Sequence, residues 1–156
     1  MQVSLSRRGM LIKIARVVTS KLIKGQYSFS NVAEISAEDL FERINSNQPH
    51  LLIDTRSKQE FDSGFGHIPN SKWIPLMDLV GSFGSADKFK KRVKELETEF
   101  KEVELFKEQE VITLCPGGGF SLVAAEIMVE AGFKDVKSLS GGVDGWFKKG
   151  YQTTLS

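Results

Sequence analysis

A strand, a glycine-rich loop and a helix in succession constrain the fold of this chain more than any other feature. Residues 111–114 (VITL) are apolar and largely β-branched, which predicts a buried strand. Residues 122–132 have the pattern of a helix that ends at Gly132. The single cysteine, Cys115, opens the connection between them, and three consecutive glycines follow after one proline. The sequence therefore predicts a cysteine between the end of a strand and the start of a helix.

Other segments repeat this alternation of short strands and helices. Residues 51–53 and 135–139 are predicted strands, and helices are predicted over 36–44, 86–106 and 143–149. Short strands that are apolar along their whole length are typical of parallel sheets covered on both faces. The sequence therefore predicts an α/β fold with a central parallel sheet and helices on both faces.

The N-terminal segment differs in charge from the rest of the chain. Residues 1–33 contain six basic and no acidic residues, although the net charge of the chain is only +1. Apolar residues recur at helical spacing over 8–24, which predicts a basic amphipathic helix. We expect its apolar face to pack on the domain or on another subunit. Peripheral contact with a membrane, or with an acidic partner, is the less favoured interpretation. Residues 1–34 are assigned to this helix and a linker, with the linker over about 25–35.

The composition and the motifs that are missing exclude several classes of protein. A chain of 156 residues with 40% hydrophobic and 26% charged residues is typical of one soluble domain. The small net charge gives no signal of nucleic-acid binding. No apolar run is long enough to span a membrane, and one cysteine cannot form an intrachain disulfide. The sequence has no cofactor motif and no metal-ligand spacing, so we expect neither a cofactor nor a metal.

The segment that follows Arg7-Arg8 decides the expected location. A twin arginine before apolar residues resembles an export signal, but basic residues interrupt the apolar stretch and no cleavage site follows. We therefore expect a cytoplasmic protein.

Residues 115–121 (CPGGGFS) have the composition of an anion-binding loop around a reactive thiol. Unpaired backbone N–H groups and the positive end of the helix dipole stabilise a thiolate at a helix N-terminus. The glycines at 117–119 leave N–H groups unobstructed and permit the positive φ angles of an anion-binding nest. Ser121 is expected to cap the helix, whereas Pro116 contributes no N–H. A buried inert cysteine, a plain turn and a phosphate site are the alternatives, but the strand-end position favours a reactive cysteine.

Motifs on both sides of this loop resemble those of the rhodanese family of sulfurtransferases. They occur in the family's order from about Ile35 to Tyr151. The matching segments are 35–40 (ISAEDL), 52–56 with Glu60-Phe61 (LIDTR and EF), 66–70 with 74–75 (GHIPN and IP), the loop that begins at Cys115, and 131–146 (AGFKDVKSLSGGVDGW). The resemblance implies a rhodanese-like α/β domain over residues 35–153.

The resemblance also implies a chemistry for Cys115. The thiolate would take a sulfane sulfur from thiosulfate, polysulfide or a persulfide and pass it to an acceptor thiol or cyanide. Small sulfur-containing anions, persulfides and an acceptor thiol or protein are then the expected partners. The candidate site residues are Cys115 as the nucleophile and, for substrate binding, Pro116, Gly117, Gly118, Gly119, Phe120, Ser121 and Arg56. A non-catalytic binding or sensor module and a protein-to-protein persulfide carrier remain as alternatives.

The loop departs from the family pattern at the positions that often carry charge. Many active members have Arg directly after the cysteine or at the fifth position beyond it, where this chain has Pro116 and Phe120. A loop without a cation favours a polysulfide or persulfide over the thiosulfate dianion as donor. Related phosphatases carry Arg at the sixth position, which is Ser121 here, so phosphatase activity is disfavoured.

Charged residues after the 51–53 strand form a second candidate group. Arg56 is a candidate for the positive charge that the loop lacks. The favoured interpretation is a structural network of Asp54, Arg56 and Glu60, because partly buried ion pairs commonly fix loops. His67 is expected to stabilise a turn rather than to transfer protons.

Overall fold

The computed structural model describes residues 32–77, 87–88, 91, 95, 101–130 and 132–155. The predicted helix over 8–24, most of the predicted linker and most of the predicted helix over 86–106 lie outside these residues.

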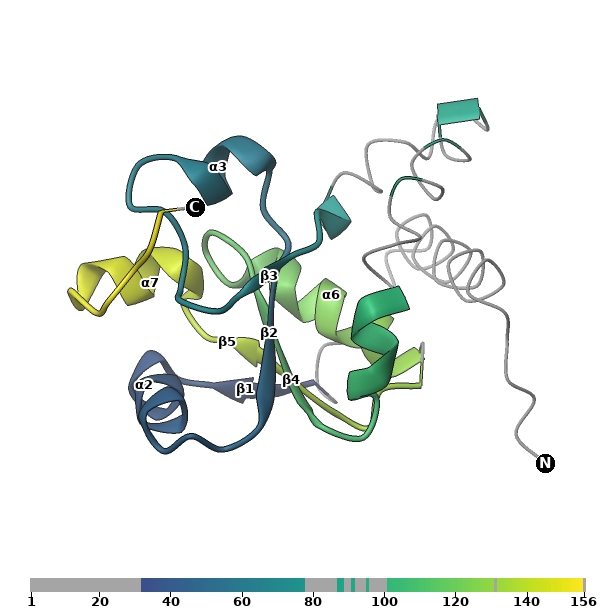
Figure 1. Cartoon of the computed structure of the whole chain (residues 1–156), viewed down its shortest axis with the longest axis horizontal. Coiled ribbons are helices and arrows are strands. Elements are labelled where there is room, and N and C mark those ends of the chain that lie inside the picture. The colour runs from purple at the N-terminus through teal and green to yellow at the C-terminus, as the bar shows by residue number, and fades with distance from the viewer. Residues whose placement is uncertain are drawn as a thin grey trace.

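A parallel sheet forms the centre of the described part of the chain (Figure 1). Its five strands are β1 (Ala33–Ile35), β2 (His50–Asp54), β3 (Lys72–Trp73), β4 (Glu110–Leu114) and β5 (Asp135–Leu139), in the order β1-β5-β4-β2-β3. All neighbouring strands are parallel. The helices between and after them are α2 (Ala37–Asn45), α3 (Lys58–Asp62), α6 (Gly119–Glu130) and α7 (Gly142–Lys148), with a short 3-10 turn at Glu104–Phe106. The predicted α/β fold is confirmed.

The central strands β2 and β4 explain why the sheet needs cover on both faces. Each of them has four consecutive buried residues, and Leu52 pairs with Ile112 in register. Because successive side chains of a strand point to opposite faces, these runs place apolar groups on both sides of the sheet.

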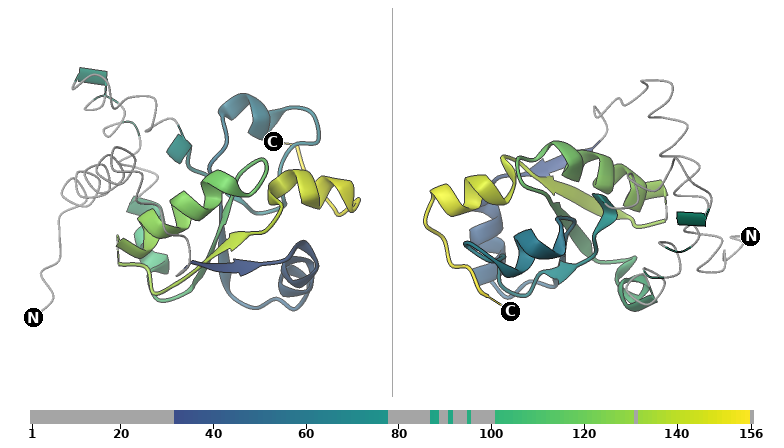
Figure 2. Two further views of the ribbon diagram at one scale, coloured as in Figure 1. Left: turned by 180° about the vertical axis from the view of Figure 1, so that it is seen from behind. Right: turned by 90° about the horizontal axis from the view of Figure 1, so that it is seen from above.

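The helices supply that cover from both sides. On one face, α6 packs Ala124 and Met128 against a core that includes Val111. On the other face, Leu40 of α2 and Trp146 of α7 pack against Leu52, Ile112 and their neighbours. Figures 1 and 2 show α6 on one side of the sheet and α2 with α7 on the other.

Strand β1 was not predicted, because residues 25–35 were assigned to a linker. Of its three residues only Ile35 is buried, so the strand carries no apolar run that a sequence pattern detects. It is an edge strand, and its place is fixed by backbone pairing with β5. The folded structure therefore includes residue 33, two positions before the predicted start of the domain.

The C-terminal segment returns to the connection between α3 and β3. Two backbone hydrogen bonds join His67 and Thr154, with N–O distances of 3.0 and 2.9 Å. The imidazole of His67 is buried, stacks on Phe61 and lies 3.0 Å through Nδ1 from the Phe61 carbonyl oxygen. The predicted role of His67 in stabilising a turn agrees with these contacts.

Candidate active site

Cys115 lies at the predicted junction, directly after β4 and four residues before the first residue of α6. The residue is only 1% exposed. The backbone N–H of Gly118 donates a hydrogen bond to its sulfur, with an N–Sγ distance of 3.1 Å. An amide N–H directed at Sγ at the start of a helix stabilises negative charge on the sulfur.

Gly118 is the glycine of the loop on which this geometry depends. It has φ +93°, whereas Gly117 and Gly119 do not have positive φ angles. A Cβ atom on Gly118 would lie 3.0 Å from the backbone nitrogen of Gly141. Of the three glycines whose sequence permits a nest conformation, Gly118 is thus the one that has a positive φ angle, and the chain already turns into α6 at Gly119.

The first turn of α7 holds the loop from the opposite side. The N–H of Val143 donates to the carbonyl oxygen of Cys115 at 2.9 Å, and that of Asp144 donates to Pro116 at 3.0 Å. A Cβ atom on Gly142 would lie 2.3 Å from the Pro116 carbonyl oxygen, so only glycine permits this approach. The sequence does not predict this contact. The pair Gly141-Gly142 indicates a turn, but it does not indicate that the turn packs on the cysteine loop.

The prediction that Ser121 caps α6 is wrong. The helix already begins at Gly119, so Ser121 lies inside its first turn and is fully buried. Its hydroxyl donates to the carbonyl oxygen of Gly118 at 3.1 Å and lies 2.7 Å from the hydroxyl of Ser138. Ser138 is not among the predicted site residues, and it lies in no motif that would have selected it.

The remaining loop positions give the site an apolar and uncharged edge. Phe120 is half-buried and packs against the core on the α6 side of the sheet. Pro116 is half-buried, and Gly117 and Gly119 are exposed. No residue of the loop carries a positive charge.

Arg56 is buried and is held by other groups. Its Nε and Nη2 atoms bind the two carboxylate oxygens of Asp54 at 2.9–3.1 Å, and Nη2 also donates to the Gly66 carbonyl oxygen at 2.8 Å. These partners lie outside the cysteine loop, which supports the structural interpretation of Arg56. Glu60 does not join this network: its carboxylate accepts from the backbone N–H of Ser57 and closes the capping box of α3.

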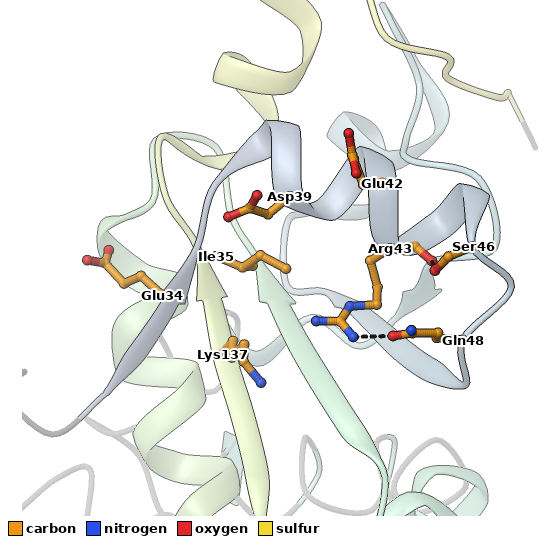
Figure 3. A pocket seen from close by; sticks show the side chains of 8 residues that line it. All are labelled: Glu34, Ile35, Asp39, Glu42, Arg43, Ser46, Gln48 and Lys137. Carbon is orange, nitrogen blue, oxygen red and sulfur yellow. Dashed lines mark hydrogen bonds between the residues drawn. The ribbon is translucent and has the colours of Figure 1, made fainter.

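A hollow lies away from the cysteine loop, between β1, β5 and α2 (Figure 3). Its volume is about 460 Å³, and it is lined by Glu34, Ile35, Asp39, Glu42, Arg43, Ser46, Gln48 and Lys137. The basic groups in this lining are already paired, because Arg43 and Lys137 both contact Glu110, with N–O distances of 3.2 and 2.8 Å. The hollow therefore contributes no group to Cys115.

The described residues include neither a cluster of metal ligands nor a membrane-spanning helix. They contain no group of three or more His, Cys, Asp or Glu side chains arranged to hold a metal ion. None of the helices among them is both long enough and apolar enough to cross a membrane.

Comparison with known proteins agrees with this architecture. Residues 36–149 match the family model of the rhodanese-like domain. The chain belongs to this family. The "Adenylyltransferase and sulfurtransferase UBA4" of Candida albicans is 24% identical over 135 residues, which cover 83% of this chain and 27% of that protein. A protein of Allochromatium vinosum named "Sulfurtransferase" is 26% identical over 119 residues, which cover 76% of this chain and 92% of that protein. The rhodanese-like chain thus spans about a quarter of the first relative and nearly all of the second.

A solved structure gives the same result for the fold. The crystal structure of a rhodanese-related protein from Thermoplasma volcanium superposes with a TM-score of 0.57 at 25% sequence identity. The match covers 80% of this chain and 99% of that chain.

Proposed function

We propose that this rhodanese-like protein is a sulfurtransferase that carries sulfane sulfur as a persulfide on Cys115. The observation that carries the proposal is the hydrogen bond from Gly118 N–H to Sγ at the junction of β4 and α6. The same amide is placed to stabilise the thiolate before transfer and the persulfide anion after it. The names of the relatives above support the same class of reaction.

The reaction proceeds in two steps that need no external oxidant or reductant. In the first step, the Cys115 thiolate attacks the outer sulfur of a donor R–S–S⁻, and the S–S bond of the donor breaks. The outer sulfur, with its negative charge, is now bound to the cysteine as Cys115–S–S⁻. The other product, R–S⁻, leaves and takes up a proton. An acceptor thiolate then attacks the outer sulfur of this persulfide, and the Cys115 thiolate is regenerated. With cyanide as acceptor, the product is thiocyanate. A covalent enzyme intermediate divides one difficult transfer into two easier ones.

The surroundings of the thiol favour a polysulfide or a persulfide as donor. Thiosulfate is a dianion, and its binding benefits from a cation that can approach the loop. The loop has none, and the guanidinium of Arg56 is held by Asp54 and Gly66.

Intact-mass spectrometry tests this proposal directly. The purified chain is incubated with polysulfide and, separately, with thiosulfate, and cyanide is then added to release thiocyanate. We expect a gain of one sulfur atom with polysulfide, little or no gain with thiosulfate, and loss of the added mass on treatment with cyanide.

The matched control is Cys115→Ser, which removes the only cysteine of the chain. This variant should gain no sulfur from either donor. A wild-type chain that gains no sulfur and yields no thiocyanate would contradict the enzymatic proposal and leave a non-catalytic binding module. Sulfur gain without turnover to cyanide or small thiols would instead favour a carrier that exchanges sulfur with a protein.

A further inference from the structure

Three hydroxyl side chains lie fully buried beneath the cysteine loop. Thr113 of β4, Ser121 of α6 and Ser138 of β5 are each 0% exposed. Thr113 and Ser138 are partners in register on adjacent parallel strands, so their side chains point to the same face of the sheet. That face is otherwise the apolar core that α6 covers. Buried hydroxyls in such a place need partners, and here they find them in one another and in the loop.

The direction of the hydrogen bonds follows from the number of protons available. Ser121 has a single hydroxyl proton, and it donates this proton to the carbonyl oxygen of Gly118 at 3.1 Å. Both bonds of Ser121 form at the same time only when Ser138 donates the proton of the 2.7 Å bond between the two hydroxyls. Thr113 fixes the same turn of helix, because its hydroxyl donates to the Ser121 carbonyl oxygen at 2.7 Å.

These bonds end on the residue that contacts the sulfur. The carbonyl oxygen of Gly118 is held by Ser121, and the N–H of Gly118 donates to Cys115 Sγ. Gly118 has no side chain to fix it, and its φ of +93° lies in a region that glycine leaves easily. A hydrogen bond on its carbonyl group therefore restricts the direction of its N–H group.

We propose that Ser138 is a positioning residue for Cys115: acting through Ser121, it keeps the Gly118 N–H directed at the sulfur. This inference rests on the proposed function in that it treats the Cys115 thiolate as the reacting group. Ser138 itself touches neither the sulfur nor a substrate. A hydrogen bond to a charged acceptor is strong only while its geometry is maintained, so loss of the Ser138 hydroxyl should weaken the stabilisation of the thiolate.

The test compares Ser138→Ala, which removes the hydroxyl, with Ser138→Thr, which keeps it and adds a methyl group. Cys115 is the only thiol, so its alkylation by iodoacetamide can be followed by mass from about pH 5 to about pH 10 without interference. We expect the pH profile of alkylation to move upward by about half to one pH unit in Ser138→Ala, because the Gly118 N–H bond would be weakened rather than lost, and a full hydrogen bond to a charged group contributes about one to two pH units. Ser138→Thr should keep the wild-type profile.

Thermal unfolding of the same variants separates positioning from packing. The added methyl group of Ser138→Thr should lower Tm in a fully buried site, whereas the pH profile should depend on the hydroxyl alone. Ser71→Ala serves as the control, because it removes a hydroxyl that donates to the Ile68 carbonyl oxygen outside the loop. It should leave the pH profile unchanged.

Two results would overturn the inference. One is a Ser138→Ala profile identical to that of the wild type, and the other is a shift in Ser138→Thr equal to that in Ser138→Ala. Alkylation does not require sulfur transfer, so the outcome is independent of the proposed function. A shifted alkylation profile in a chain that accepts no sulfur would leave the positioning role intact and contradict only the sulfurtransferase activity.

Discussion

At the residue scale, the site combines a buried thiol, which accepts a backbone hydrogen bond, with a loop that has no charged side chain. The sulfur of Cys115 accepts a hydrogen bond from the Gly118 N–H. Backbone N–H groups of α7 donate to the carbonyl oxygens of Cys115 and Pro116. Phe120 occupies the position where many relatives of this fold carry Arg, and its ring packs against the core. The loop therefore contacts the sulfur through a backbone N–H group and carries no charged side chain.

Substitution of Phe120 tests this division of roles. In Phe120→Arg, a guanidinium at the edge of the loop should raise thiosulfate-dependent thiocyanate formation about tenfold, the factor given by about 1.4 kcal/mol of added attraction. Turnover with polysulfide should change much less, because that donor depends less on a cation. The rates with both donors are measured by the formation of thiocyanate.

Phe120→Gln is the matched control, because it opens the same space without adding charge. It should not gain thiosulfate turnover. Equal gains in the Arg and Gln variants would mean that steric access, and not charge, limits the use of thiosulfate.

At the scale of elements, the N-terminal ends of the helices α6 and α7 both contact the loop that follows strand β4. The loop after β4 leads into α6, and the first turn of α7 packs on the same loop from the far end of β5. The close approach needs glycine at position 142, where φ is +62° and a Cβ atom would overlap the carbonyl groups of Pro116 and Cys115. The turn between β5 and α7 thus fixes the loop as well as reversing the chain.

Two glycines of α7 provide a matched pair for this idea. Gly142→Ala should lower the free energy of unfolding by roughly 2–5 kcal/mol, from backbone strain and from displacement of the loop. Gly145→Ala meets no atom within 4 Å and has no positive φ, so it should raise stability by roughly 0.5–1 kcal/mol, as alanine does inside a helix. Denaturant unfolding measures both. Similar effects from the two substitutions would contradict the packing role of Gly142.

At the scale of the whole molecule, charge pairs join elements at the end of the sheet away from the cysteine. Glu110 at the start of β4 contacts Arg43 of α2 and Lys137 of β5, and Lys137 also contacts Asp135. Burial disfavours the charged form of Lys137, but the hydrogen bonds that its ammonium group donates to Asp135 and Glu110 outweigh this effect and raise its pKa. The pairs connect two strands with a helix, and their basic members Arg43 and Lys137 line the hollow in Figure 3.

The raised pKa of Lys137 sets the sign of a pH dependence. The pKa of Lys137 is higher in the folded chain than its unfolded value of 10.5. The charged side chain therefore stabilises the fold fully at pH values below 10.5. This stabilisation is lost as the pH rises through the folded pKa. Lys137→Met should therefore lower the free energy of unfolding near neutral pH. The gap, which is the difference in this free energy between the variant and the wild type, should narrow above pH 10.5. Denaturant unfolding at a series of pH values follows the gap.

The control for this titration is Lys148→Met, which removes the same charge from an exposed position on α7. Its gap to the wild type should be smaller near neutral pH than that of Lys137→Met. A Lys137→Met gap that widened above pH 10.5 would contradict the assigned sign.

The sequence by itself determined the alternation of strands and helices, the parallel sheet and the place of Cys115. These features follow from local patterns: unbroken apolar runs at 51–53 and 111–114, helical spacing after the loop, and Gly132 at the helix end. The interpretation of Arg56 as a structural residue also came from neighbours close in sequence.

Only the tertiary structure decided how the site is held. Strand β1 has no apolar run and exists through its pairing with β5. Ser121 lies inside α6 and is not its cap. The hydroxyl of Ser138, seventeen residues further along the chain, lies 2.7 Å from the hydroxyl of Ser121. The approach of Gly142 to the cysteine loop likewise joins segments far apart in the sequence. Local patterns report the period of burial along one element, whereas these contacts depend on which strands become neighbours, and the packing of the whole sheet fixes that.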